Sequence, residues 1–210
     1  MASNEQLKNE FLRAYSSGSV CLHPTDTIPG LTFDPFHRDA FKSFVQVKTR
    51  PPSKSLLGLV GSIDVALKYW QPLPGHWHSI LRTLWPAPLS VVWTASEHCP
   101  KSLRNEDNTA GFRMPDLDES YQWFTEILHE IDHPLPTTSV NTSGQPPITD
   151  WQQAASFLQD QPNCWATNLD GPLNSTPSTV IALDEHGGFQ VLRHGAFDPQ
   201  NIQQSASNIV

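Results

Sequence analysis

Short apolar runs alternate with segments whose apolar residues recur at helical spacing, and this alternation limits the chain mainly to folds that combine strands with helices. The runs at 19–22, 56–60, 89–94 and 109–114 have the length and composition of buried strands. The clearest helical repeat lies at 117–131, where apolar residues follow one another at steps of four, three, four and three. We therefore expect short strands joined by amphipathic helices.

The last third of the chain has a different pattern. Apolar runs at 180–183 and 189–192 flank a turn at 185–188, which is typical of an antiparallel strand pair. Because strands and helices alternate early and strands pair late, the sequence predicts an α/β fold with a mixed sheet covered by helices.

Two helix starts carry capping signals. Ser3 with Gln6 and Thr149 with Gln152 each have the spacing of a capping box. Further helices are expected around 41–50, 62–69 and 76–84.

Length and composition favour one domain. The chain has 210 residues with 38% hydrophobic content, enough for a sizeable core. We expect a domain at 1–197 and a loosely held C-terminal tail at 198–210. Two segments rich in proline, glycine and polar residues, 23–31 and 137–144, are predicted to be irregular.

The sequence offers little sign of export or membrane insertion. Its three cysteines are widely spaced, its apolar runs are shorter than a membrane span, and its start lacks the order of a secretion signal. We expect a soluble, unprocessed protein of a reducing cytoplasm.

Three cationic residues lie within a stretch of seven in an otherwise acidic chain. The net charge is −8, which argues against a broad nucleic-acid surface, yet Lys48, Arg50 and Lys54 stand together just before a buried strand. A mixture of guanidinium and ammonium groups on a short connection suits a polyphosphate. The alternative that remains open is an ordinary solvated basic turn.

Ser139 and Asn141 stand two apart, so in extended backbone both would point to one side. A hydroxyl and an amide can bind phosphate or ribose without adding charge, although serine and asparagine also favour plain turns.

Arg113 lies in an apolar setting, Gly111 to Pro115, where a partly buried guanidinium needs an anionic partner. A protein carboxylate is the default candidate for that partner. For Arg193 and the segment 175–179 the same choice, between a partner within the protein and an external anion, arises with weaker evidence.

Common signatures are missing from the sequence. It contains no P-loop, dinucleotide-binding glycine turn, zinc-protease helix motif or hydrolase nucleophile elbow. His76 and His78 lack the spacing of a helical metal pair. A binding site in this chain would use another scheme.

Six segments, taken in order, closely resemble the YrdC-like family over about residues 19–196. They are Pro24-Thr25-Asp26-Thr27-Ile28-Pro29-Gly30-Leu31, Lys48-Thr49-Arg50 with Lys54, Trp85-Pro86-Ala87-Pro88-Leu89, Arg113-Met114-Pro115, Thr138-Ser139-Val140-Asn141-Thr142-Ser143-Gly144, and Ser178-Thr179-Val180 with Leu192-Arg193-His194-Gly195. Each segment alone is weak evidence for the family, but the six together, in this order and spacing, are specific to it.

The resemblance implies an open twisted mixed sheet covered by helices, with a large concave cationic cleft. It also implies L-threonylcarbamoyladenylate synthase activity. This reaction converts L-threonine, bicarbonate and ATP into threonylcarbamoyl-AMP and pyrophosphate, for threonylcarbamoyl modification of the tRNA adenosine next to the anticodon. The absence of an extra C-terminal domain suggests the short bacterial type, TsaC.

Residue roles follow from the resemblance, motif by motif. The expected ATP-binding residues are Lys48, Arg50, Lys54, Ser139, Asn141 and Arg193. The expected threonine-binding residues are Thr27, Arg113 and Ser178. No catalytic base and no protein metal ligand are nominated, and Mg2+ is expected with ATP.

Some positions depart from the usual family pattern. The family often has Tyr at the place of Pro29, Pro at Ser55 and Gly at Ala87, and some members have His at Leu59. These changes concern the packing around threonine.

The resemblance implies several partners and leaves alternatives. Expected partners are small-molecule substrates and proteins that complete transfer to tRNA, with at most weak direct tRNA binding and no membrane. One alternative is a non-catalytic nucleotide- or RNA-binding relative. Others are carbamoyl adenylation as in HypF, whose zinc-binding and acylphosphatase parts do not fit in 210 residues, and an unrelated α/β binding protein.

Overall fold

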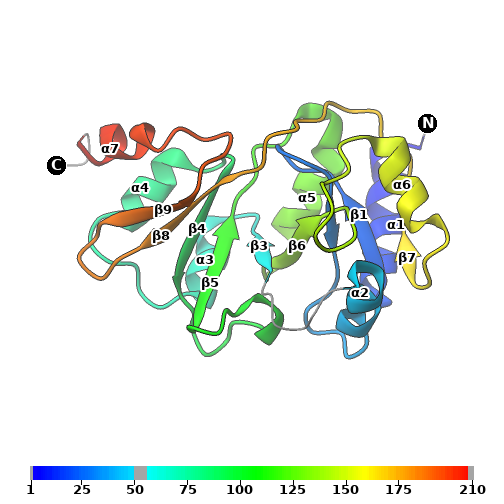
Figure 1. Cartoon of the computed structure of the whole chain (residues 1–210), viewed down its shortest axis with the longest axis horizontal. Helices are drawn as coiled ribbons and strands as arrows, with labels where there is room; N and C mark the ends of the chain where they lie inside the picture. The colour runs from blue at the N-terminus through cyan, green and yellow to red at the C-terminus, as the bar shows by residue number, and fades with distance from the viewer. Residues whose placement is uncertain (1, 50–55, 208–210) are drawn as a thin grey trace.

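One mixed sheet runs across the computed structural model, which describes residues 2–49 and 56–207; within these ranges it has nine strands (Figure 1). In spatial order they are β7 (Cys164–Trp165), β1 (Val20–His23), β2 (Gly30–Thr32), β6 (Leu135–Ser139), β3 (Leu57–Leu59), β5 (Thr109–Arg113), β4 (Leu89–Thr94), β8 (Thr179–Leu183) and β9 (Phe189–Arg193). β1 with β7, β3 with β5, and β4 with β8 are parallel pairs, and the other neighbours are antiparallel. The predicted mixed α/β sheet is confirmed.

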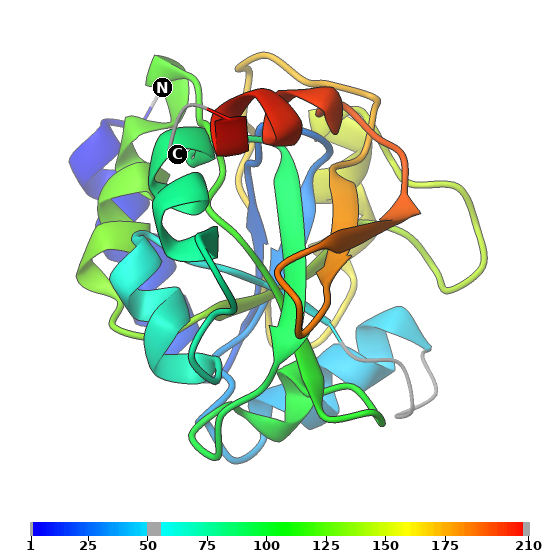
Figure 2. The ribbon, with the colours of Figure 1, turned by 90° about the vertical axis from the view of Figure 1, so that its left-hand side faces the viewer.

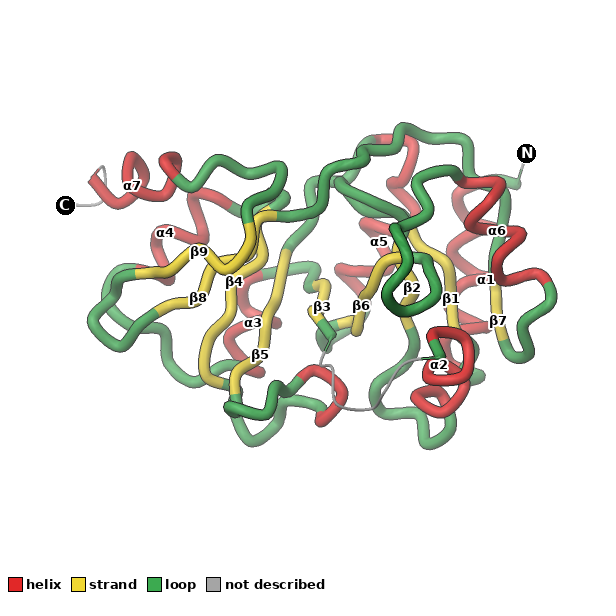
Figure 3. The backbone as a smooth tube through the Cα atoms, in the orientation of Figure 1, coloured by secondary structure: helices red, strands yellow, loops and turns green. Residues whose placement is uncertain are grey.

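Helices cover the two faces of the sheet unequally (Figure 2). One face carries α1 (Asn4–Ser16), α3 (Ile63–Tyr69), α4 (Trp77–Leu84) and α5 (Gln122–Glu130). The other face carries α2 (Ala40–Lys48) and α6 (Trp151–Gln159), both near the β1 end (Figure 3). Two short 3₁₀ helices, Lys101–Leu103 and Glu119–Tyr121, and a last helix, α7 (Gln200–Ser207), complete the described elements.

Local signals place several elements as expected. Ser3 accepts from the backbone N–H of Gln6, and the Gln6 side chain accepts from the Ser3 N–H, so α1 begins with the predicted capping box. The N-cap of α6 (Trp151–Gln159) is Asp150, one residue after the predicted cap Thr149, because the Asp150 side chain accepts from the Gln153 N–H.

Two strands lie in segments that were expected to be irregular. β2 begins inside 23–31, and β6 overlaps the start of 137–144. β2 pairs with β1 and β6, and β6 also pairs with β3, so long-range hydrogen bonds order both segments despite their proline and glycine. Local composition carries no signal for such partners.

The expectation of a loose tail at 198–210 is wrong for its described part. Residues 200–207 form α7, which packs against α4, and Ile202 is 2% exposed within the main core. Ile202 and Ala206, four residues apart, supply the apolar side that holds this helix.

A buried histidine links β1, β2 and α5. His23 and Gly30 are register partners, and the His23 ring stacks on Phe124 with ring centroids 5.0 Å apart. A Cβ on Gly30 would lie 2.3 Å from His23 Nε2, so only glycine leaves room for the ring.

We expect Gly30→Ala to lower the free energy of unfolding by about 1–3 kcal/mol, because the added methyl group forces His23 out of its packed position. Urea unfolding would measure the change, with Ser156→Ala on the exposed side of α6 as a control. A midpoint equal to that of the wild type would contradict the packing argument.

Candidate functional site

A cavity of about 300 Å³ lies where several strand ends and their connecting loops meet. Its walls are the β1–β2 connection, the end of β5, the end of β6, the 177–178 segment and the end of β9. Of the nine residues expected to bind ligands, five line it: Thr27, Arg113, Ser139, Ser178 and Arg193. Segments more than 160 residues apart in sequence thus supply one site.

Arg113, at the end of β5, is 5% exposed and bonded on one side. Its Nη1 donates to Thr27 Oγ1 at 2.9 Å and lies 3.0 Å from Asp26 Oδ1. The protein carboxylate predicted to partner this guanidinium is therefore Asp26. Burial lowers the pKa of Arg113, while Asp26 opposes that change. Arginine remains charged at any ordinary pH.

The loop that carries Asp26 and Thr27 is fixed by its own hydrogen bonds. Thr25 Oγ1 accepts from the Thr27 N–H at 3.0 Å and donates to the Ile28 carbonyl at 2.7 Å. Asp26 Oδ2 accepts from the Asp116 N–H. Burial raises the pKa of Asp26, and Arg113 and the backbone donor oppose the rise. The loop therefore presents the Thr27 hydroxyl in a defined place.

Arg193 wraps around Ser178 on the wall formed by the 177–178 segment and the end of β9. Its Nε and Nη2 donate to the Ser178 carbonyl at 3.1 and 2.8 Å, and Nη2 also lies 3.1 Å from Ser178 Oγ. Ser178 Oγ is 2.9 Å from the hydroxyl of Ser90, a fully buried residue of β4. A predicted phosphate ligand and a predicted threonine ligand are thus bonded to each other.

Lys48, Ser139 and Asn141 form a third cluster beside the cavity. Lys48 Nζ donates to the carbonyls of Ser139 and Asn141, both at 2.7 Å, and to Asn141 Oδ1 at 2.6 Å. Ser139 Oγ donates to Asn141 Oδ1 at 2.8 Å, so the two side chains do share one side as expected. Ser139 belongs to the cavity lining, whereas Lys48 and Asn141 stand outside it. Arg50 and Lys54 fall outside the described residues.

Sequence reasoning missed three contributors: Asp26, Ser90 and His23. Asp26 stands inside the 24–31 motif, but the resemblance alone implies no role for it. Ser90 is a hydroxyl residue among the apolar residues 89–93 of its strand, which is the signal that could have marked it. His23 is fully buried, and its only sequence signal is its place directly before that motif.

His23 is held neutral behind the cavity wall. Its Nδ1 lies 2.9 Å from the Pro24 carbonyl, so Nδ1 must carry the proton, and Nε2 lies 2.9 Å from Thr137 Oγ1, from which it accepts. Burial lowers the pKa of His23 to about 4, and nearby Arg113 adds to the decrease.

This shift predicts a loss of stability in mild acid. The unfolded chain takes up the histidine proton near pH 6.5 and the folded protein near pH 4, so the contribution of His23 is complete above pH 6.5 and falls away as the pH drops to 4. The loss is on the order of 3 kcal/mol. His23→Gln should flatten the curve of unfolding free energy against pH within this window, and equal slopes for both proteins would contradict it.

Comparison with known proteins decides the family. The Sua5/YciO/YrdC family model, described as "Telomere recombination", matches residues 13–195. The chain belongs to this family. The family expected from the sequence motifs is thereby confirmed.

Relatives and solved structures of the Sua5/YciO/YrdC family agree with this assignment. A threonylcarbamoyl-AMP synthase of Pseudoalteromonas translucida is 28% identical over 169 residues, covering 79% of this chain and 87% of that protein. The crystal structure of P. abyssi Sua5 complexed with L-threonine matches with a TM-score of 0.81 at 24% identity, covering 98% of this chain and 58% of that one. E. coli YciO matches with a TM-score of 0.78 at 20% identity, covering 96% of this chain and 95% of that one. These two structures support the fold.

The part of the chain that the structure describes has neither a cluster of metal-binding side chains nor a helix able to span a membrane. No three His, Cys, Asp or Glu side chains within residues 2–49 and 56–207 come together as a metal site. Across the same ranges, every helix falls short of the length and apolar character that crossing a membrane requires.

Proposed function

We propose that this chain is an enzyme, a nucleotidyltransferase that forms threonylcarbamoyl-AMP and pyrophosphate from L-threonine, bicarbonate and ATP. The observation that carries the proposal is the convergence of Arg113, Thr27, Ser178, Arg193 and Ser139 on one cavity. Family membership and the names of the relatives support it.

The threonine end of the site is proposed at Arg113. The Thr27 and Asp26 contacts use Nη1, while Nη2 and Nε carry three more donors of the guanidinium. A substrate carboxylate would bind on that side, where two parallel N–H groups match its geometry. Thr27 and Ser178 would then contact the rest of the amino acid.

The phosphate end is proposed at Arg193 and Ser139, which line the cavity from the ends of β9 and β6. Asn141 is bonded to Ser139, and Leu56 and Leu57 are also part of the lining. Arg50 and Lys54 precede Leu56 in sequence by six and two positions, so they are proposed as the cations that meet the triphosphate.

The proposed reaction requires neutralisation of charge and no covalent intermediate with the enzyme. The amine of threonine would attack CO2, or bicarbonate with loss of water, to give a carbamate. A carbamate oxygen would then bond to the α-phosphorus as the bond to the pyrophosphate oxygen breaks. Fixed guanidinium and hydroxyl groups would hold two anionic reactants together and stabilise the leaving pyrophosphate.

Mg2+ would enter as a complex with ATP. Asp26, the carboxylate next to the site, is already bonded to Arg113 and to a backbone N–H, so it is a poor metal ligand. Magnesium commonly binds through substrate phosphates with few protein ligands, and its role would be to neutralise phosphate charge.

The product would pass to partner proteins in the cytoplasm that modify the tRNA adenosine next to the anticodon. With a net charge of −8, direct tRNA binding is expected to be weak at physiological salt.

Arg50→Ala and Lys54→Ala should each lower threonine-dependent pyrophosphate release by a factor on the order of 100 or more, because each removes a cation that stabilises phosphate charge. Lys101→Ala, at an exposed lysine of the Lys101–Leu103 helix, is the matched control. Unchanged turnover in both variants would refute their assigned role. Absence of threonylcarbamoyl-AMP from the wild-type reaction, measured by mass spectrometry, would instead favour a non-catalytic relative.

Thr27→Val should raise the KM for threonine about tenfold or more, with the KM for ATP nearly unchanged, because it removes a hydroxyl bonded to a buried charged group. Thr83→Val, on the exposed side of α4, provides the control. Equal changes in both KM values would place Thr27 outside the threonine subsite.

A further inference from the structure

Lys48 is a buried ammonium with three oxygen acceptors. It is the last residue of α2 and only 3% exposed, and its Nζ lies 2.6–2.7 Å from two carbonyls and one amide oxygen of Ser139 and Asn141. A lysine ammonium has three N–H groups, so these acceptors match its donors one for one. Such charge-assisted bonds offset the cost of burying the charge.

The same contacts hold one loop, residues 139–145. Asn141 Oδ1 accepts from both Lys48 Nζ and Ser139 Oγ, while Asn141 Nδ2 donates to the Gln145 carbonyl. The Ser143 N–H donates to the carbonyl of Lys48 at 3.3 Å, which ties the loop back to the end of α2. Lys48 is therefore bonded to residues 139, 141 and 143 of the loop, and Asn141 connects these contacts to Gln145.

We propose that Lys48 is a positioning residue that fixes the 139–145 loop before any nucleotide arrives. Ser139 reaches the cavity and Lys48 does not line it, so Lys48 acts on the ligand through Ser139 and Asn141. This changes the role expected from the sequence, in which Lys48 was one of three phosphate-binding cations. The effect on catalysis rests on the proposed function, whereas the effect on the loop does not.

The geometry also implies that an arginine could not replace Lys48. Three acceptors converge on one point, which a compact ammonium can occupy. The N–H groups of a guanidinium spread over a planar fork and cannot all meet them. Lys48→Arg keeps the charge and should still release the loop.

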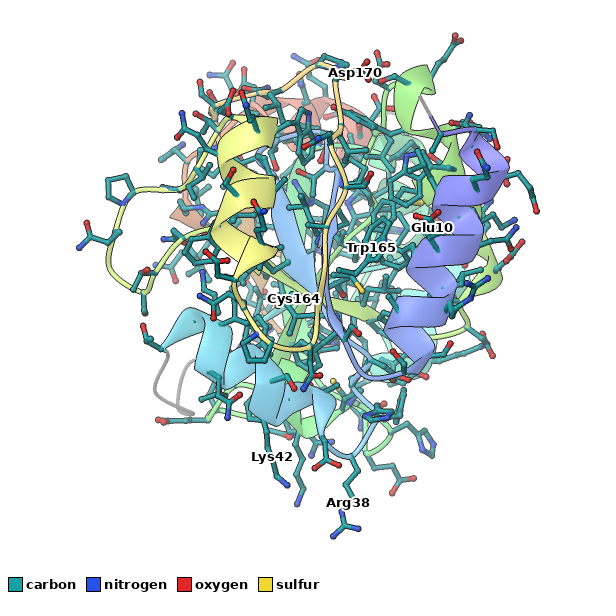
Figure 4. All side chains as sticks on the ribbon, turned by 90° about the vertical axis from the view of Figure 1, so that its right-hand side faces the viewer. Glu10, Arg38, Lys42, Cys164, Trp165 and Asp170 are labelled. Atoms are coloured by element: carbon teal, nitrogen blue, oxygen red, sulfur yellow. The ribbon has the colours of Figure 1, made fainter. Side chains whose placement is uncertain are left out.

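Hydrogen exchange on the ligand-free protein tests the proposal without any assay of activity. Lys48→Met should speed amide exchange in the 139–145 loop by about tenfold or more relative to wild type, since it removes three charge-assisted hydrogen bonds. Lys42→Met is the matched control: it lies on the same helix, its side chain points away from the body of the molecule (Figure 4), and its ion partner Asp39 is exposed. The control should leave loop exchange unchanged. Equal loop exchange in Lys48→Met and wild type would overturn the proposal.

Lys48→Arg supplies the readout that separates positioning from direct phosphate binding. Positioning predicts faster loop exchange and lower kcat/KM for ATP in Lys48→Arg, nearly as in Lys48→Met. Wild-type exchange together with retained kcat/KM in Lys48→Arg would assign Lys48 to the phosphates and overturn the inference.

Asn141→Ala provides a second test of the proposal if the Lys48 variants do not fold. It removes one of the three acceptors at a half-buried surface position, so it should speed exchange in the loop and leave the amides of α2 unchanged. Unchanged loop exchange would count against the proposal. A wild-type protein that forms no threonylcarbamoyl-AMP would refute the proposed function and leave these exchange results standing.

Discussion

Charged groups that leave water need polar partners, and in this molecule the partners are the loops that build the site. Arg113 holds the 26–27 segment, Arg193 holds Ser178, and Lys48 holds the 139–145 loop. Arg113 and Lys48 are 5% and 3% exposed, so these bonds offset the cost of burying them, and each cation contacts a loop that carries a neutral hydrogen-bonding residue. Arg193 is exposed and binds Ser178 from the surface. The site is ordered by its charges before a ligand is present, which lowers the cost of binding.

Close backbone approaches make these contacts possible. A Cβ on Gly195 would lie 2.2 Å from the Pro177 carbonyl, so glycine lets the chain after β9 pass directly beside the 177–178 segment. The Gly195 N–H donates to Thr179 Oγ1 and the Ala196 N–H to the Pro177 carbonyl. This packing sets Ser178 against Arg193, just as Gly30 sets β2 against His23 on the other wall.

Sequence patterns predicted what depends on local order. The α1 cap, the apolar strands and the β8–β9 hairpin follow from spacing and composition, and the family motifs include five residues expected to bind ligands that the fold brings to one cavity. They could not predict β2 or β6, since both exist through pairing with distant strands. They also could not show that Asp26 meets Arg113 across 87 positions, or that Lys48 turns inward, because both contacts depend on tertiary structure.

The charge balance of the cavity supports the phosphate-binding role proposed for the 48–54 cluster. Among the described residues of the lining, the cations are Arg113 and Arg193, and Asp26 offsets the first. Lys48 is committed to oxygens of the 139–145 loop. These groups balance little of the negative charge that a triphosphate and an amino acid carboxylate would bring together. We therefore propose Arg50 and Lys54, which precede the wall residue Leu56 by six and two positions in sequence, as the cations of the cluster that meet this charge.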